Sequence, residues 1–305
     1  MTVVSSSMVK ALRDRTGAGM MDCKTALTET HGDMEQAVDW LRKKGLSKAA
    51  KKADRAATDG LIGVITRDKV GAIVEVNSET DFVARNAQFQ ELVRAITALA
   101  PQAKSDLPKL LALPYPGKGA SVEEHIKAMV ATIGENMSVR RTAEVSVSEG
   151  IVGEYVHNKV ADGLGRIGVL VAIESRGEKA VLAAFGRQIA MHIAAASPAA
   201  VTAEQLDPAL IARERAVYTE QAMASGKPPE IAAKMVEGRL RKEFFQQTVL
   251  LQQTFLGAGG DGKATVEQVL KDNEKKAGAP IAIAMFVRYA LGETFDKAAP
   301  ATGKE

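Results

Sequence analysis

The chain contains an internal repeat, and this feature limits its possible folds more than any other. Residues 59–63 (DGLIG) are matched by residues 149–153 (EGIVG), and residues 70–74 (VGAIV) are matched by residues 167–171 (IGVLV). In each copy the two segments are short, apolar and rich in β-branched residues, which predicts a β-hairpin. Because the segments recur in the same order, we expect the same supersecondary unit twice.

Helical patterns follow each hairpin, also in the same order. Apolar residues recur at helical spacing around 89–100 and 181–196, and both patterns end near a proline. Later in each copy a hydroxyl residue is followed three positions on by Glu or Gln, which is the capping box of a helix start. The two boxes are Ser121-Val122-Glu123-Glu124 and Thr265-Val266-Glu267-Gln268.

A further strand candidate closes each copy, at residues 138–147 and 281–291. The order β-β-α-α-β thus predicts an α+β fold with two repeated three-stranded antiparallel subdomains. Only the second copy contains a long charged helical pattern, residues 208–250, which is broken at residues 225–229 (SGKPP). We expect this insertion to form an antiparallel helical hairpin of coiled-coil type. Its predicted seam consists of Leu210, Val217, Ala224, Ile231, Met235 and Leu240.

The N-terminal residues predict a bundle of three short helices. Ser5 to Ser7 and Asp33 are N-cap candidates, and Gly45 is predicted to end the third helix. A basic, alanine-rich linker follows, with six Lys or Arg residues between 43 and 55. The predicted parts are the bundle and linker (1–57), the N subdomain (58–148), the C subdomain (149–200 with 251–292), the hairpin insertion (201–250) and a tail (293–305).

The segment between the strand at 72–76 and the helix that begins after Asn86 turns a corner without Gly or Pro. Composition alone favours a Phe82 that packs into the core at the helix entry. However, the second copy has Glu174-Ser175-Arg176-Gly177 at its corner and lacks an equivalent of Thr80-Asp81-Phe82-Val83. This difference reverses the preference, so we expect an exposed Phe82 wedge with Asp81 as its polar neighbour.

Composition and residue spacing favour a binding protein over an enzyme. The net charge of +3 is too small to indicate nucleic acid as the main partner. The single cysteine, with no export signal or membrane span, predicts a cytoplasmic protein. The four histidines lack metal-site spacing, and no phosphate-binding loop or nucleophile motif occurs. We therefore expect no cofactor, metal site or direct nucleotide binding; an RNA-binding accessory protein using the basic linker and helical arm is the alternative.

Four segments, in this order along the chain, resemble the elongation factor Ts family. They are residues 9–24 (VKALRDRTGAGMMDCK), 79–84 (ETDFVA), 166–171 (RIGVLV) and 225–228 (SGKP). The resemblance covers nearly the whole chain. It implies a guanine-nucleotide exchange factor of translation elongation, with elongation factor Tu as its partner, and an N-terminal bundle of the UBA-like type.

The resemblance also implies roles for particular residues. Thr80, Asp81, Phe82 and Val83 would enter the GTPase domain of elongation factor Tu beside its magnesium site, with Phe82 wedging between helices. His157 would approach the same partner from the second subdomain. The bundle would grip a helix of the GTPase through Arg13, Met20 and Met21, because flexible, exposed methionines suit such a contact. The helical arm also offers a surface for self-association.

Two features depart from the family pattern. The loop after His157 is longer than the short glycine-rich loop common in the family, so the position of this histidine on the partner stays open. Residues 292–305 show little apolar periodicity, where many members continue into a helix that touches the partner. We expect that contact to be missing here.

Overall fold

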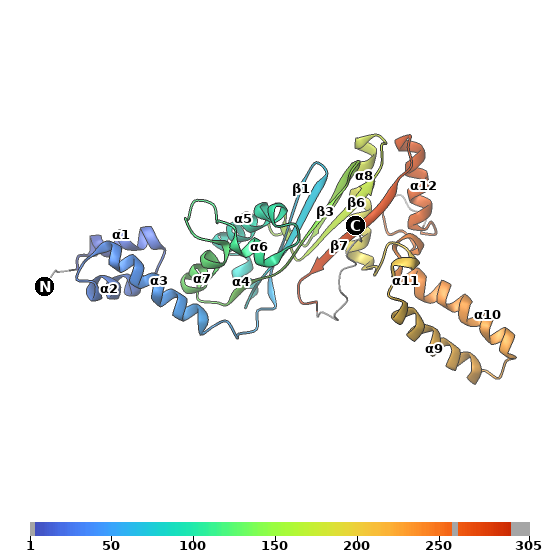
Figure 1. Ribbon diagram of the computed structural model, residues 1–305, viewed down its shortest axis with the longest axis horizontal. Helices are drawn as coiled ribbons and strands as arrows, with labels where there is room; N and C mark the ends of the chain where they lie inside the picture. Colours follow the sequence, from blue (N-terminus) through green and yellow to red (C-terminus); the bar gives the residue numbers. More distant parts are fainter. Residues whose placement is uncertain (1–3, 258–261, 294–305) are drawn as a thin grey trace.

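The computed structural model describes residues 4–257 and 262–293. Within these ranges the chain is elongated, with a helical bundle at one end, a helical arm at the other, and antiparallel sheets between them (Figure 1). This combination confirms the predicted α+β class. None of the helices in these ranges is both long and apolar enough to cross a membrane. The predicted tail lies outside the described residues except for its first residue, Glu293.

The N-terminal bundle is formed by α1 (Ser6–Thr16), α2 (Met20–Glu29) and α3 (Met34–Ala50). Ser5 accepts a hydrogen bond from the backbone N–H of the first turn of α1, and Asp33 does the same for α3, as predicted. The buried core of the bundle consists of Leu12, Cys23, Ala26, Leu27 and Ala37.

The prediction that α3 ends at Gly45 is wrong, because the helix continues to Ala50. At this position α3 packs against α7 (Val122–Ile133). A Cβ atom added to Gly45 would lie only 3.1 Å from the Cβ atom of Ala131. The glycine therefore permits a close approach of two helices, and it does not terminate one.

The first sheet contains β1 (Asp59–Arg67), β2 (Val70–Ser78), β3 (Met137–Ser146) and β5 (Leu164–Gly165), in the order β3-β2-β1-β5. The prediction of a three-stranded sheet is therefore wrong for the first copy. Its additional strand comes from the loop of the second copy that follows His157. Leu164 and Gly165 pair with Gly63 and Ile62 on the outer edge of β1. The two copies are thus joined by backbone pairing.

Helices cover one face of this sheet. The short α4 (Asp81–Ala84) leads into α5 (Ala87–Ala103), which ends near Pro101, as predicted, with the proline inside its last turn. The connection to α7 contains a further short helix, α6 (Leu107–Ala112), which was not predicted. The capping box at Ser121 is formed as predicted. Phe89, Leu92, Val93 and Ile96 of α5 are buried against the sheet.

The second sheet has the order β4-β6-β7, with β4 at Gly150–His157, β6 at Ile167–Glu174 and β7 at Ala282–Ala290. It is covered by α8 (Lys179–Ala196) and α12 (Val266–Ala277), and the capping box of α12 at Thr265 is formed as predicted. The remaining faces of the two sheets pack on each other through a shared cluster that includes Ile62, Ile73, Leu170 and Tyr289.

A buried ion-pair network also joins the two sheets. Glu75 of β2 is fully buried and accepts hydrogen bonds from Arg140 at 3.1 Å and from Arg141 at 2.5 Å. The Arg141 guanidinium lies 3.9 Å from the ring centroid of Tyr289 on β7 and also pairs with Glu293 at 3.3 Å. Burial raises the pKa of Tyr289 to about 12. Glu293 therefore takes part in the contacts between the two sheets.

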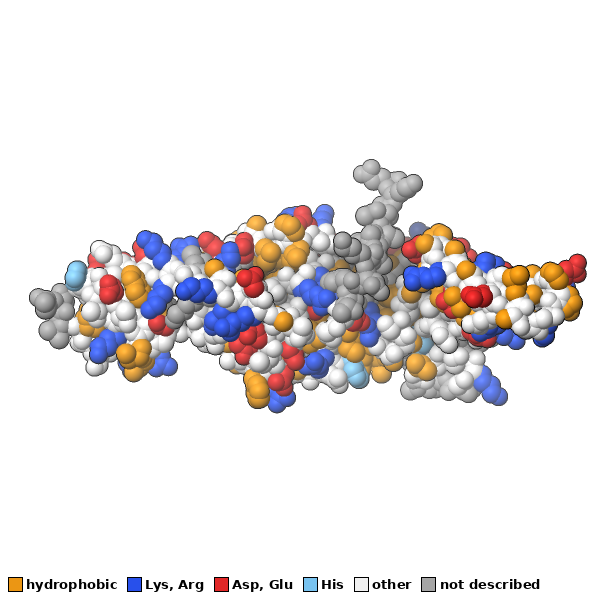
Figure 2. Space-filling view, turned by 90° about the horizontal axis from the view of Figure 1, so that it is seen from below, with side chains coloured by type: hydrophobic (Ala, Val, Ile, Leu, Met, Phe, Trp, Pro, Cys, Tyr) orange, Lys and Arg blue, Asp and Glu red, His pale blue; other side chains and the backbone are white. Residues whose placement is uncertain are grey.

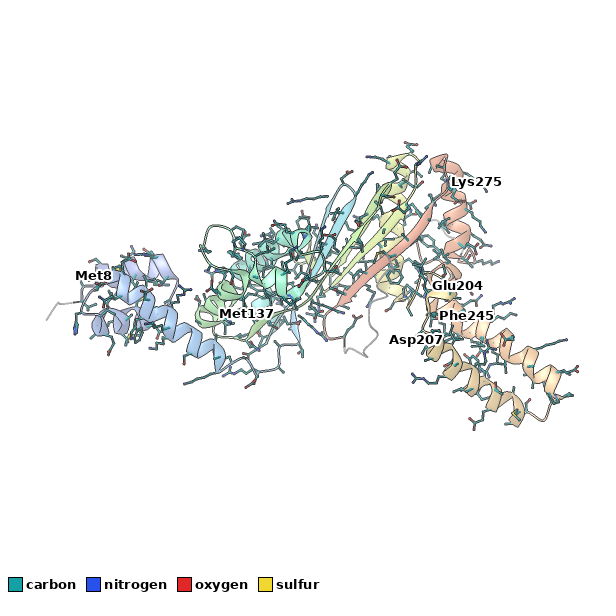
Figure 3. The ribbon with its side chains drawn as sticks, in the orientation of Figure 1. Met8, Met137, Glu204, Asp207, Phe245 and Lys275 are labelled. Atoms are coloured by element: carbon teal, nitrogen blue, oxygen red, sulfur yellow. The ribbon has the colours of Figure 1, made fainter. Side chains whose placement is uncertain are left out.

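The helical arm consists of α9 (Pro208–Ala224) and α10 (Pro229–Arg239), followed by a π-helical segment (Leu240–Phe245). Figure 3 labels Asp207 and Phe245, which lie where the arm joins the body. The hairpin and its turn are as predicted, but the predicted seam is only partly right. Leu210 and Leu240 belong to the apolar cluster between the helices, as predicted, whereas Val217, Ala224 and Ile231 are exposed. The two helices also meet through Tyr218, Ala222, Ala232 and Val236.

Candidate functional site

The corner between β2 and α5 holds Phe82 outward on a buried support. Thr80 is the N-cap of α4, and Val83 and Ala84 at the end of this helix are 5% exposed and belong to the first core. Asn86 then caps α5 by accepting from the backbone N–H groups of its first turn. In a helix of one turn, only some side chains can face the core. Phe82 lies on the other side and is 76% exposed, as the asymmetry between the copies predicted.

Glu135, which follows α7, clamps the start of this corner. Its carboxylate accepts a hydrogen bond from the Thr80 backbone N–H at 3.1 Å and another from the Thr80 hydroxyl at 2.8 Å. The Ser78 hydroxyl donates to the Thr80 carbonyl oxygen at 3.0 Å. Thr80, two residues before Phe82, is therefore held by three hydrogen bonds, of which two involve its backbone and one its side chain.

Asn136 ties the same corner to the end of the basic linker. Its backbone N–H donates to Glu79 at 2.5 Å, and its side-chain amide donates to the carbonyl oxygens of Ala53 and Arg55. Glu79 also lies 3.5 Å from the Arg55 guanidinium. Sequence reasoning missed Glu135 and Asn136 because their partners are far away along the chain. The only local signal was two polar residues between the Gly134 helix cap and a strand.

Asp81 is held at the surface next to Phe82. Its carboxylate accepts from the Arg85 guanidinium at 2.9 Å; the Arg85 side chain is 73% exposed and that of Asp81 is 40% exposed. Such exposed pairs along a helix are worth only about 0.3–0.5 kcal/mol. Asp81 can therefore exchange Arg85 for a positive group of a partner at little cost.

His157, the last residue of β4, is linked to the corner by consecutive contacts. Its carbonyl oxygen accepts from the Arg166 backbone N–H at 3.1 Å, and the Arg166 guanidinium donates to Asp59 at 3.0 Å. Asp59 is the strand partner of Ser78, whose hydroxyl holds Thr80. The structure thus brings His157 and the corner to the same end of the first sheet. The imidazole of His157 is exposed and lies 3.1 Å from the Tyr155 hydroxyl.

The predicted contact residues of the bundle lie on separate elements from this corner. Arg13 is exposed on α1, and Met20 and Met21, at the start of α2, are 57% and 73% exposed. On the face drawn in Figure 2, hydrophobic side chains reach the surface in separate patches. The structure therefore offers several separate apolar contact points.

The second copy has no exposed aromatic side chain at its corner, residues 174–177. The Ser175 hydroxyl donates to the Pro280 carbonyl oxygen at 2.7 Å and accepts from the Gly177 backbone N–H at 3.0 Å. A Cβ atom on Gly177 would lie 2.7 Å from the Ala277 side chain. This corner is packed against α12, so the copies differ in structure where they differ in sequence.

The described residues contain no group of three or more His, Cys, Asp and Glu side chains placed to hold a metal ion. His192 is buried on α8, as predicted for a packed histidine, and its ring lies 2.9 Å from the Gln253 side chain. Burial lowers the pKa of this histidine. The polar groups Glu135 and Ser78 near Phe82 hold the backbone of the corner in place.

Comparison of the sequence with known proteins identifies the family of this chain. A family model described as elongation factor TS matches residues 79–293, from the corner to the end of the described chain. The chain belongs to the elongation factor Ts family. Elongation factor Ts of Parvibaculum lavamentivorans is 57% identical over 297 residues, which cover 97% of this chain and 95% of that protein. The elongation factor Ts proteins of Bartonella henselae and Rhodospirillum centenum are 55% and 54% identical, over 96% and 98% of this chain.

Proposed function

We propose that this protein is a guanine-nucleotide exchange factor of translation elongation. It binds elongation factor Tu in the GDP form and promotes release of GDP, so that GTP can bind. Membership of the elongation factor Ts family supports this function. The observation that carries the mechanism is the 76% exposed Phe82 on a corner held by Glu135, Ser78 and buried neighbours.

In this mechanism Phe82 inserts between helices of the GTPase beside its magnesium site, with Asp81 as the polar neighbour and Thr80 and Val83 at either side. Complete burial of a Phe side chain contributes about 1.5–3 kcal/mol. If all of this free energy stabilises the state in which GDP is being displaced, the rate of GDP release rises by about 10-fold to 100-fold. Disturbing the magnesium coordination removes positive charge from the phosphates of GDP and loosens them further. No covalent bond forms or breaks, so the chain acts without catalytic residues or a cofactor.

Secondary contacts supply the rest of the binding energy. We place His157 on the same partner because a series of contacts connects it to the corner. Its carbonyl oxygen binds Arg166, Arg166 binds Asp59, and Asp59 is the strand partner of Ser78, which binds the Thr80 carbonyl oxygen. The bundle, which we assign to the UBA-like type, contacts a helix of the GTPase through Arg13, Met20 and Met21. The functional parts are 1–57, 58–148, 149–200 with 251–292, and the arm 201–250.

Thermodynamic linkage explains how binding alone accelerates exchange. A factor that binds nucleotide-free elongation factor Tu more tightly than the GDP form must weaken GDP binding by the same factor. The protein binds no nucleotide itself and therefore does not select which nucleotide enters next. The relative concentrations of GTP and GDP make that selection.

The test is release of a fluorescent GDP analogue from elongation factor Tu, measured by stopped flow at increasing concentrations of this protein. We expect wild type to accelerate release, and Phe82→Ala to lower the acceleration by about 10-fold to 100-fold. Met223→Ala is the matched control, because Met223 is equally exposed, at 72%, but lies on the arm. Full activity of Phe82→Ala would reject the wedge, and an inactive wild type would reject the exchange function.

A further inference from the structure

The helical arm carries a groove that the exchange function does not use. It has a volume of 840 Å³ and runs between α9 and α10 on one side of the arm. Its floor is apolar and includes Ala222, Met223, Ala232 and Val236. Ala222, Ala232 and Val236 are buried in the seam, whereas Met223 is 72% exposed. Hydrophobic side chains also reach the surface along the arm in the view of Figure 2.

Small residues leave this groove open to a close approach. Ala233 and Gly238 of α10 line it, and a Cβ atom added to Gly238 would meet no atom within 4 Å. Glycine in a helix costs about 1 kcal/mol relative to alanine, and here no neighbour within the chain requires it. Such positions let the backbone of another helix come near.

The rim of the groove is strongly basic. It carries Arg215, Lys227, Lys234, Arg241 and Lys242, against a single acidic residue, Glu237. Glu237 is paired with Arg215. The other four cations form no ion pair within the part of the chain that the structure describes. The groove therefore presents excess positive charge beside an apolar floor, and its complement is an acidic surface with an apolar stripe.

The shape of the groove and the positions of its cations favour a helical occupant. Lys234 lies on α10, whereas Lys227 lies in the turn before this helix and Arg241 in the π-helical segment after it. A ligand that pairs with all three must therefore extend along the arm beside the apolar floor, as a third helix packed on two others does. No aromatic residue lines the groove, so it lacks the stacking surface that single-stranded nucleic acid uses.

We propose that this groove binds an acidic amphipathic helix of another protein, which lies along α9 and α10 as a third helix. Its apolar stripe covers Met223 and the small residues of the floor. Its carboxylates, spaced along its length, pair with Lys227, Lys234 and Arg241. The arm thereby provides a second docking site, separate from the corner at Phe82.

The test uses full-length protein and a fluorescently labelled synthetic helix of about four heptads, with Leu and Ala on one face and Glu beside them. A peptide with Lys in place of every Glu is the matched control probe. Fluorescence anisotropy should show binding of the acidic peptide and at least about tenfold weaker binding of the basic one. Rising salt should weaken the acidic complex, because its ion pairs are exposed.

Three variants locate the binding. Gly238→Leu places a larger side chain at a position where an added Cβ atom meets nothing within 4 Å. Lys234→Glu with Arg241→Glu reverses the charge of the groove. Each change should weaken binding of the acidic peptide by about tenfold. Arg213→Glu, on α9 outside the groove, is the charge control and should change binding by less than about twofold. Circular dichroism verifies that each variant is folded.

The proposal would be overturned if the acidic and basic peptides bound the protein equally well. It would also be overturned if the Gly238→Leu variant bound the acidic peptide as tightly as wild type does. If a single-stranded RNA bound more tightly than the acidic peptide, and the same variants abolished that RNA binding, the groove would be a nucleic-acid site. A dimer in sedimentation that Gly238→Leu dissociates would make a second copy of this chain the occupant.

Discussion

A change at Glu135 tests whether Phe82 must be held in its observed position, since it alters the support of the corner and leaves the Phe82 side chain intact. Glu135→Ala removes the acceptor of both Thr80 donors, at 3.1 and 2.8 Å. Hydrogen bonds to a charged group contribute about 1.5–3 kcal/mol each, and partial exposure places these near the lower end, so the corner loses about 2–3 kcal/mol of local stability. Because Glu135 acts only by positioning, its loss cannot exceed that of Phe82→Ala. We expect stimulated GDP release to fall by about tenfold.

The assay is the same stopped-flow release of fluorescent GDP, with Glu123→Ala as control. Glu123 is an exposed carboxylate on α7 that pairs with Lys127 and makes no contact with the corner. In a Phe82→Ala background, Glu135→Ala should add less than about twofold, since both changes remove the same contact. Wild-type activity of Glu135→Ala, or losses that multiply in the double variant, would refute this positioning role.

Two further predictions concern the network between the sheets. Glu75→Gln should lower the free energy of unfolding by about 3–5 kcal/mol, because it removes the buried carboxylate that Arg140 and Arg141 bind. The measurement is urea denaturation followed by far-UV circular dichroism. The control, Glu123→Gln, should lower the same free energy by less than about 1 kcal/mol. Tyr289 has a pKa raised to about 12, above the unfolded value of about 10, so the folded state binds the proton more tightly and stability should fall by about 2–3 kcal/mol as pH rises from 10 to 12. Tyr289→Phe should lack this alkaline loss, and equal losses in both proteins would contradict the assignment.

Most of the core could be predicted from the sequence, because its signals are local. The strands and the caps at Asn86, Ser121 and Thr265 depend on periodicity and on side chains a few residues away. The seam of the arm was harder to place. Its helices are rich in alanine and carry similar residues on adjacent faces, so the apolar stripe is poorly defined, and Tyr218 and Val236 occupy the seam in place of Val217 and Ile231.

Other features depend on residues that meet only after folding. The two-residue strand β5 is too short to show any periodicity, and Gly45 has the sequence context of a helix end although it faces Ala131. The clamp of Glu135 on Thr80 joins residues from different elements. The exposure of Phe82 was predictable only by comparing the two copies, since the segment alone resembles an ordinary helix entry.

The strand β5 also affects how this protein must be synthesised. The outer edge of β1 is complete only after Leu164 and Gly165 have been added, yet β1 to β3 precede them in the chain. While the ribosome is still translating the second copy, the first presents an open edge at Ile62 and Gly63, to which another nascent chain can pair. A gene fragment that stops before Leu164 would yield a product with that edge permanently open. The second half of the polypeptide therefore covers the edge of the first at Ile62 and Gly63.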